Sequence, residues 1–415
     1  MTSHPTLRIN GDRLWTRLMD MAQIGATAKG GVNRVALSDE DRIGRDLFIQ
    51  WCEAAGCTVS VDQIGNIFAR RPGKNNDAPA VMAGSHLDSQ PTGGKYDGVY
   101  GVLAALEVVE TLNDHNIETD VPIEIVNWTN EEGARFAPAM LASGVFCGEF
   151  SLEYGLTRED RSGLTIRDEL KRIGYAGAEK IGQRNYKATF EIHIEQGPIL
   201  EAEGKAVGIV TGVQAMRWYN ITIPGKESHA GTTPMERRRD PVQAALPIWS
   251  QVFDVAAEHA PDSRVTIGEI YASPASINTV PGSLFFTLDM RHPSEESLLN
   301  MDNSVRQIVE EIVAASGLEV NFEEIWYSPA VTFDPACIDS VRRAVETTGV
   351  SAMEIVSGAG HDAVYISRVA PTSMIFVPCA DGLSHNELES AEKHDLVDGC
   401  NVLLHAMLDQ AIVDS

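Results

Sequence analysis

Apolar residues follow two patterns along the 415-residue chain, and each predicts a different kind of element. Short continuous apolar runs predict buried strands, and apolar residues that recur every three or four positions predict helices. In chain order we predict a strand at 79–84, a helix at 98–113, strands at 122–128 and 188–194, helices at 337–348 and 361–369, a strand at 372–378 and a helix at 391–412. This alternation predicts an α/β domain with a mostly parallel sheet that helices cover on both faces.

The middle of the chain has a different order of elements. There we predict a strand at 215–223, a helix at 240–258, strands at 264–272 and 284–291, a helix at 294–316 and a strand at 318–327. The order β-α-β-β-α-β is that of the ferredoxin-like arrangement, which is self-contained. We therefore expect residues 214–327 to form an inserted α+β domain, and residues 1–213 and 328–415 to form one discontinuous domain.

Charge and composition exclude some classes of partner. The chain has 33 basic and 59 acidic residues, a net charge of −26, whereas a nucleic-acid or anionic-membrane surface needs clustered Lys and Arg. It has no apolar run long enough to span a membrane, and its first ten residues lack the basic and apolar segments of a secretory signal. Its six scattered cysteines form no CxxC pair, so reduced thiols and a cytoplasmic location are expected.

Histidines and carboxylates recur at the ends of predicted strands, where ligands bind in open α/β sheets. His86 and Asp88 follow the strand 79–84, and Asp97 comes after a Gly-rich loop. This is a metal-site pattern, in which Asp88 could accept the other ring N–H of His86. By itself, the segment could equally be a surface histidine with aspartates in turns.

Two further strand ends carry similar groups. Glu131 and Glu132 follow the strand that ends at Trp128, and His193 lies in the strand 188–194. Adjacent carboxylates could be a solvated loop edge, or could divide their roles between metal ligand and proton acceptor. His385 lies in a polar loop after the strand 372–378, a position where a lone histidine is usually just solvated.

Taken together, these residues make a stronger case than any one of them. Nitrogen and oxygen ligands without thiolates suit Zn, Mn, Co or Ni. One carboxylate that bridges two ions, each with two further ligands, would form a two-metal hydrolase site. The candidate ligands are His86, Asp97, Glu132, His193 and His385.

Five segments, in matching order along nearly the whole chain, resemble a known family. They are GSHLDSQPTGGKYDGVYGVLA, NEEGARFAPAMLASGVF, HIEQGPILE, KESHAGTTPMERRRDP and SHNELE. The sequence resembles the amidase, hydantoinase/carbamoylase family, which includes N-carbamoyl-L-amino acid hydrolases, β-ureidopropionases and allantoate amidohydrolases. This family is a branch of the di-zinc aminoacylase and carboxypeptidase clan.

The resemblance implies a role for each matching position. Asp97 would bridge two divalent ions, His86 and His193 would complete one site, and Glu132 and His385 the other. Glu131 would be the general base and Asp88 the partner of His86. The residues that would hold the substrate are Gln196, His229, Asn278, Arg291 and Gly360.

Residue chemistry agrees with several of these roles. Arg291 can grip a carboxylate with two parallel hydrogen bonds, and His229 can donate to a developing oxyanion. Asn278 can bond a carboxylate or carbonyl but is also a routine turn residue, and Gly360 lets backbone N–H groups approach a ligand. His361 and Asp362, which follow Gly360, are expected to support the site or to cap a helix.

The resemblance also implies a function and an assembly. We expect hydrolysis of N-carbamoyl-L-amino acids or N-carbamoyl-β-alanine, with allantoate or another ureido acid as the alternative substrate. The inserted domain would act as a lid and as the contact of a homodimer. A metal-free binding or scaffold protein is the alternative of another class, against which all five ligand residues and Glu131 argue.

Overall fold

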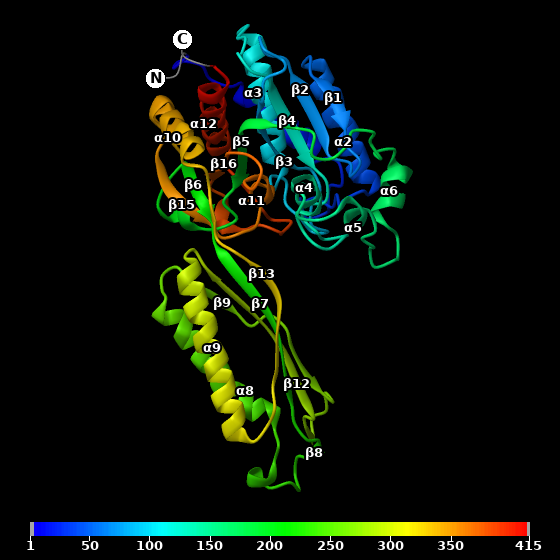
Figure 1. Cartoon of the computed structure of the whole chain (residues 1–415), viewed down its shortest axis with the longest axis vertical. Coiled ribbons are helices and arrows are strands. Elements are labelled where there is room, and N and C mark those ends of the chain that lie inside the picture. Colours follow the sequence, from blue (N-terminus) through cyan, green and yellow to red (C-terminus); the bar gives the residue numbers. More distant parts are fainter. Residues whose placement is uncertain (1–3, 413–415) are drawn as a thin grey trace. The chain divides into compact units, whose positions relative to one another are not determined.

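The computed structural model describes residues 4–412, which divide into two units (Figure 1). Unit 1 contains the described residues up to Gly212 and from Thr332 onward, and unit 2 spans Val213–Val331. The boundaries expected from sequence, 214 and 327, lie one and four residues from those of unit 2. No described helix is long and apolar enough to cross a membrane. All six cysteines are free thiols.

Unit 1 is built on a nine-stranded sheet with the order β1-β2-β4-β3-β5-β16-β6-β14, and β15 pairs with β6. Its strands are β1 (Thr58–Val61), β2 (Ile67–Arg71), β3 (Ala80–His86), β4 (Ile123–Trp128), β5 (Tyr186–Ile194), β6 (Val207–Val213), β14 (Val331–Thr332), β15 (Ala352–Ser357) and β16 (Thr372–Val377). The neighbours β4, β3, β5 and β16 run parallel. The β1–β2, β2–β4 and β6–β16 pairs are antiparallel. The predicted parallel sheet is therefore the centre of a mixed sheet.

Helices cover both faces of this centre. Ser85 in β3 lies against Gly101 of α3 (Val99–Asp114), whereas Ala80 and Met82 pack with Ile366 of α11 (Asp362–Ile366). Because side chains alternate along a strand, α3 and α11 lie on opposite faces. The remaining helices are α1 (Gly11–Met21), α2 (Asp39–Ala54), α4 (Leu141–Cys147), α5 (Leu152–Leu156), α6 (Ile166–Ile173), α7 (Ile199–Ala202), η2 (Ala380–Gly382), α10 (Pro335–Thr348) and α12 (Lys393–Ala411).

Local chemistry explains where two helices differ from prediction. Helix α10 begins two residues early, because the Asp334 side chain accepts hydrogen bonds from two backbone N–H groups and Pro335 suits the first helical position. Helix α11 was expected over 361–369 but ends at Ile366. Pro371 follows shortly after and disfavours the helical conformation at the residue before it.

Unit 2 contains the predicted β-α-β-β-α-β order, with one strand broken. The elements are β7 (Ala215–Pro224), β8 (Ser228–His229), η1 (Met235–Arg237), α8 (Pro241–Glu258), β9 (Arg264–Thr266), β10 (Ile270–Ser273), β11 (Thr279–Val280), β12 (Ser283–His292), α9 (Glu295–Ser316) and β13 (Asn321–Ser328). The main sheet has the antiparallel order β10-β12-β7-β13. The strand expected at 264–272 breaks at Gly268 into β9 and β10, which both pair with β12.

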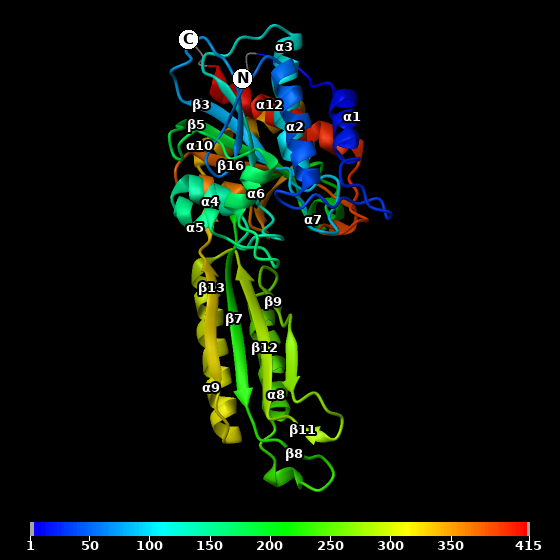
Figure 2. The ribbon, with the colours of Figure 1, turned by 90° about the vertical axis from the view of Figure 1, so that its right-hand side faces the viewer.

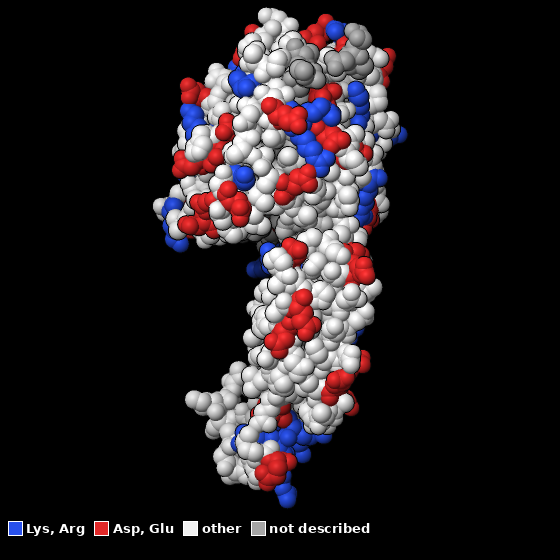
Figure 3. Space-filling model, turned by 90° about the vertical axis from the view of Figure 1, so that its left-hand side faces the viewer, with Lys and Arg blue, Asp and Glu red and all other residues white. Residues whose placement is uncertain are grey.

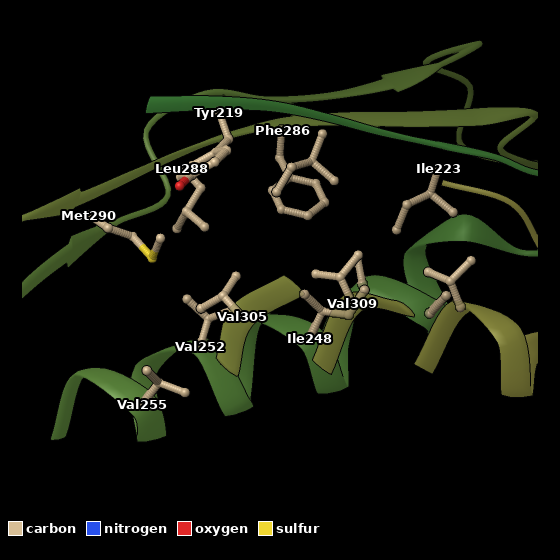
Figure 4. Packing of buried hydrophobic residues seen from close by; sticks show 14 of the residues in the cluster. Tyr219, Ile223, Ile248, Val252, Val255, Phe286, Leu288, Met290, Val305 and Val309 are labelled. Carbon is tan, nitrogen blue, oxygen red and sulfur yellow. The ribbon is translucent and has the colours of Figure 1, made fainter. Parts of the chain in front are cut away.

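One face of this sheet forms the core of unit 2. Along β12, buried and partly exposed residues alternate strictly, as expected when one face is covered. Phe286 and Leu288 pack on Val305 of α9 and on Ile248 of α8 (Figure 4). The alternation visible in the sequence therefore places both helices on the same face of the sheet.

Candidate metal centre

The five candidate ligands lie at the carboxyl ends of the four parallel strands of unit 1. His86 is the last residue of β3, His193 is the penultimate residue of β5, and Glu132 follows β4. Asp97 precedes α3, and His385 lies in the loop after β16. Parallel neighbours end at the same edge of a sheet, so the chain brings these side chains together at that edge.

One group of ligands is fully buried and contains His86, Asp97 and His193. Oδ1 of Asp97 lies 3.7 Å from Nε2 of His86 and 3.2 Å from Nε2 of His193. Each ring places its other nitrogen, Nδ1, against a backbone carbonyl, that of Asp88 at 2.8 Å and that of Ile194 at 2.9 Å. When both rings are neutral, as they are when they bind a metal ion, each donates from Nδ1 and directs the lone pair of Nε2 toward the carboxylate.

The second group contains Asp97, Glu132 and His385 and is partly exposed. Here the other oxygen of Asp97, Oδ2, lies 3.6 Å from Nε2 of His385, which is 3.3 Å from Oε2 of Glu132. The side chain of His385 is 53% exposed. Asp97 therefore presents one oxygen to each group, which is the arrangement that a bridging carboxylate requires.

These donors fit divalent metal ions. Within each group the candidate ligand atoms all lie within 4.8 Å of one another. Lone pairs directed at a carboxylate oxygen repel it unless a cation lies between them. The donor set of imidazole and carboxylate, without thiolate, suits zinc, manganese, cobalt or nickel.

A close approach of the backbone holds the first group together. Gly98 follows Asp97 at a φ of 68°, a conformation that other residues rarely adopt. A Cβ atom on Gly98 would lie 2.3 Å from two atoms of the His86 ring. Only glycine therefore allows the loop that carries Asp97 to pack this closely on His86.

The electrostatics of the first group favour a bound cation. Burial lowers the pKa of His86 to about 4, which keeps that ring neutral. Burial also disfavours the charged form of His193, but the hydrogen bond and charge of Asp97 outweigh it and raise its pKa to about 9. For Asp97, these two histidines outweigh burial and lower the pKa. With a pKa of about 9, His193 would have to release a proton when a metal ion binds.

Glu131 and Glu132 differ in what they face. Oε2 of Glu131 lies 3.4 Å from Nε2 of His86, beside the first group, whereas Glu132 belongs to the second group. Burial raises the pKa of Glu131, and the nearby charges of Asp362 and Glu132 raise it further. Burial and Asp97 also raise the pKa of Glu132. A carboxyl with a raised pKa beside a metal site is suited to exchange protons with a water molecule.

Asp88 lies next to His86, but its carboxylate does not have the predicted partner. The acceptor for the His86 ring is the backbone carbonyl of Asp88. Its carboxylate accepts instead from the backbone N–H groups of Glu131, at 3.2 Å, and Glu132, at 3.3 Å. The backbone carbonyl of Asp88 thus takes the place that was expected for its carboxylate.

Three other predicted residues lie near this centre. The side-chain amide of Gln196 donates to Oδ2 of Asp97 at 2.9 Å and to Ser384. Gly360 faces the methyl group of Met140. Of the two roles expected for His361, support of the site or a helix cap, its side chain does not cap α11. It bonds the Ser357 hydroxyl, and its ring packs 4.7 Å from the His193 ring, beside the site.

His229 and Asn278 lie together in unit 2. His229 in β8 pairs with Thr279 in β11, and Ala230 donates to the carbonyl of Asn278. Nδ1 of His229 accepts from the backbone N–H groups of Gly231 and Thr232. The proton of the neutral ring is therefore on Nε2, and the exposed ring presents a donor.

Arg291 lies elsewhere in unit 2. It is eight residues along β12 from Ser283, a rise of about 26 Å at about 3.3 Å per residue. Strands β8 and β11 lie at the end of the sheet where β12 begins (Figure 2). Arg291 forms an ion pair with Asp289 at 2.7 Å. Unit 2 therefore separates Arg291 from His229 and Asn278 by more than the length of a small substrate.

Sequence patterns did not identify two residues that support the centre. Glu389 accepts from the backbone N–H groups of Tyr96 and Asp97, and Gln90 donates to Glu132. Glu389 stands four residues after His385 and Gln90 two residues after Asp88, inside segments already chosen for their chemistry. Proximity to a ligand in the sequence was the only available signal.

Comparison with known proteins places this site in a family. Residues 82–409 match the family described as Peptidase family M20/M25/M40. An N-carbamoyl-L-amino-acid amidohydrolase of Rhizobium meliloti is 49% identical over 404 residues, 97% of each chain. An allantoate amidohydrolase of Bacillus subtilis is 32% identical and covers 92% of this chain and 93% of its own.

A solved structure agrees with these relatives. The crystal structure of an amidase of the hydantoinase/carbamoylase family from Burkholderia multivorans superposes with a TM-score of 0.95 at 56% identity. The match covers 99% of this chain and 100% of that one. The chain therefore belongs to peptidase family M20/M25/M40 and, within it, to the amidases of the hydantoinase/carbamoylase family.

Proposed function

We propose that this protein is a metal-dependent amidohydrolase that removes the carbamoyl group from N-carbamoyl-L-amino acids. The observation that carries the proposal is the shared carboxylate of Asp97, with one oxygen toward each ligand group and Glu131 beside it. The relative from Rhizobium meliloti, at 49% identity over 97% of the chain, supports the choice of substrate. N-carbamoyl-β-alanine belongs to the same substrate class.

Two divalent ions, zinc or alternatively manganese, cobalt or nickel, would occupy the two groups. His86, Asp97 and His193 would hold one, and Asp97, Glu132 and His385 the other. When bound, such ions polarise a carbonyl oxygen and make water easier to deprotonate. The carboxylate of Asp88 would fix the backbone position of Glu131 and Glu132, because it accepts hydrogen bonds from their N–H groups.

Glu131 would carry the proton transfers of the reaction. It would accept a proton as water attacks the ureido carbon, and would return a proton to the amine as the C–N bond breaks. The products would be the free amino acid and carbamate, which decomposes to CO2 and ammonia. His229 would donate from Nε2 to the developing oxyanion, because its Nδ1 is already occupied as an acceptor.

The substrate carboxylate would be held by Arg291, with Gln196, Asn278 and Gly360 as further contacts. Within one unit 2, about 26 Å of β12 separates Arg291 from the end of the sheet where His229 and Asn278 lie. Because one small substrate cannot reach both, we propose that a second copy of the chain supplies one set. This proposal requires a homodimer.

An apolar surface of unit 2 supports that assembly. On α8, Val242, Leu246, Trp249 and Phe253 recur at helical spacing and are partly or largely exposed. Ile270 and Tyr271 are exposed on β10, at the edge of the sheet. On the face of this unit that Figure 3 shows, most of the surface is uncharged. An apolar helix stripe beside an open strand edge is a surface that a second copy can cover.

Mixed dimers test whether His229 serves the partner subunit. Glu131→Gln and His229→Ala variants should each be nearly inactive. If His229 acts across the dimer, subunit exchange between them creates one intact site per mixed dimer, and about a quarter of wild-type activity returns. If His229 acts within its own subunit, every site keeps one defect and mixing restores nothing, which would refute the shared site.

Allantoate is the second candidate substrate, since the Bacillus subtilis relative is an allantoate amidohydrolase. Ammonia release from a panel of N-carbamoyl-L-amino acids, N-carbamoyl-β-alanine and allantoate distinguishes the two. We expect the highest kcat/KM with an N-carbamoyl-L-amino acid, and loss of activity after treatment with a chelator. A preference for allantoate would reverse the ranking, and metal-loaded enzyme that is inactive on the whole panel would refute the proposed function.

Arg291→Lys tests the grip on the carboxylate. Lysine keeps the charge but not the planar fork, so KM for the free acid should rise while the carboxamide analogue is unaffected. Wild-type enzyme that handles acid and carboxamide equally well would show that Arg291 does not recognise the carboxylate.

A further inference from the structure

The segment 129–132 carries both glutamates of the centre and is held at its start by buried groups. Thr129 is buried, and its backbone N–H donates to Oδ1 of Asn66 at 3.0 Å. Its hydroxyl accepts from Nη2 of Arg45 at 3.2 Å. Further along the segment, the carboxylate of Asp88 accepts hydrogen bonds from the backbone N–H groups of Glu131 and Glu132. The position of both carboxylates therefore depends on groups that touch neither of them.

Arg45 joins three parts of unit 1. It lies in α2 with its side chain fully buried, and its Nε donates to Asp41, also fully buried, at 2.8 Å. Nη1 donates to the carbonyl of Gly65 at 2.8 Å, and Nη2 reaches Thr129. Only a planar guanidinium offers donors in three fixed directions from one side chain. Arg45 thus ties helix α2 and the turn after β1 to the end of β4.

The energetics of burial argue that this arrangement serves geometry more than stability. Removing an arginine and an aspartate from water carries a large free-energy cost, and a well-packed apolar pair is often as stable or more so. The neighbouring core is apolar, since Phe48 of α2 and Ile64 are fully buried. An ion pair at this point fixes the direction of the donors toward Gly65 and Thr129, which apolar side chains could not do.

We propose that Arg45 is a positioning residue for hydrolysis, which acts through the Thr129 hydroxyl to set the segment that carries Glu131 and Glu132. The inference rests on the proposed function for its activity readout. It also predicts weaker metal binding, because Glu132 is a candidate ligand on the same segment. Residues that orient metal ligands typically change metal affinity or activity by about 10- to 100-fold when they are replaced.

The test compares Thr129→Val with Thr129→Ser in the full-length protein. Valine has nearly the same shape but removes the acceptor for Arg45, whereas serine keeps the hydroxyl. We expect Thr129→Val to lower kcat by about 10- to 100-fold and to weaken Zn²⁺ or Mn²⁺ binding, with KM changed by no more than about twofold. The Thr129→Ser variant should retain the wild-type kcat and the wild-type metal affinity. Thr347→Val, which removes a hydroxyl bonded to the carbonyl of Arg343 in α10, is the matched control and should change neither.

Arg45→Lys extends the test to the arginine. Lysine can pair with Asp41 but cannot also reach Gly65 and Thr129, so this variant should resemble Thr129→Val. Should it fail to fold, the Thr129 pair decides alone. A Thr129→Val enzyme with wild-type kcat and metal affinity would overturn the inference, as would a Thr129→Ser enzyme that is equally impaired.

Failure of the proposed function would be visible separately. Wild-type protein that binds metal but hydrolyses no member of the substrate panel would refute that function. The metal titrations of wild type, Thr129→Val and Thr129→Ser would then still decide whether Arg45 positions the segment.

Discussion

The two ligand groups share Asp97 but differ in how firmly the fold holds them. His86 and His193 are buried, belong to strands, and donate from Nδ1 to backbone carbonyls. His385 lies in a loop with a φ of 53°, and its side chain is more than half exposed. The first group is therefore preorganised and shielded from water, whereas the second is open to solvent.

This difference in burial predicts a difference in metal affinity between the two groups. A ligand held by a strand and a backbone hydrogen bond loses little further freedom when a metal binds, so affinity is high. An exposed ligand on a loop must be ordered on binding and competes with water. We expect the buried group to retain its ion and the exposed group to exchange it.

Replacing the shared residue should have the largest effect. Asp97→Asn removes the charge that both groups use, and an amide cannot bridge two ions with two oxygens. We expect both ions to be lost and hydrolysis to fall by at least about 10³-fold, because both metal roles disappear. Metal content by elemental analysis, with circular dichroism to verify folding, checks this. A variant that retains one firmly bound ion would mean that one group does not need Asp97.

Glu131→Gln should abolish turnover but leave both groups loaded. The general base contributes about 10²–10⁴-fold, and Glu131 belongs to neither ligand group. Metal content and ammonia release, measured on one preparation, separate the two effects. Loss of metal from this variant would show that the roles of Glu131 and Glu132 have been exchanged.

Removing one histidine from each group compares the groups directly. His193→Ala should weaken metal binding more than His385→Ala, which should keep one tightly bound ion per subunit. We expect a difference of about 10-fold or more in dissociation constant, from titration of the metal-free variants with Zn²⁺. Equal losses would show that burial does not decide affinity here.

The last expected effect is that of pH on metal binding, which changes by a modest factor for each pH unit. His193, whose pKa is raised to about 9, is protonated at neutral pH in the metal-free protein, whereas His86, at about 4, is not. Metal must displace the proton of His193, so affinity should rise with pH up to about 9, by about tenfold per unit for one proton. Calorimetry in two buffers with different heats of ionisation measures the released proton. Affinity that is constant between pH 6 and 9 would contradict the expectation.

Much of this protein could be predicted from its sequence alone. The periodicity of apolar residues located the central strands, α3 and α12, and the β-α-β-β-α-β order of unit 2, since burial on one face leaves a regular spacing in the chain. The sequence also predicted that His86, Glu132 and His385 lie near one another, because each comes at or after the end of a strand and parallel strands end at the same edge of the sheet. The strands β1, β2, β6, β14 and β15, which flank the parallel centre, were not predicted, and two of them, β1 and β14, have only four and two residues in which a pattern could show.

Only the tertiary structure decided how the site residues meet. Sequence spacing placed Asp88 near His86, but packing determined that its carbonyl faces the ring and its carboxylate faces the backbone of Glu131 and Glu132. The separation of Arg291 from His229 along β12, and the contact of Arg45 with Thr129, were likewise invisible in the sequence. The physical reason is that periodicity records whether a side chain is buried, whereas its hydrogen-bond partner depends on segments distant in the chain that folding brings beside it.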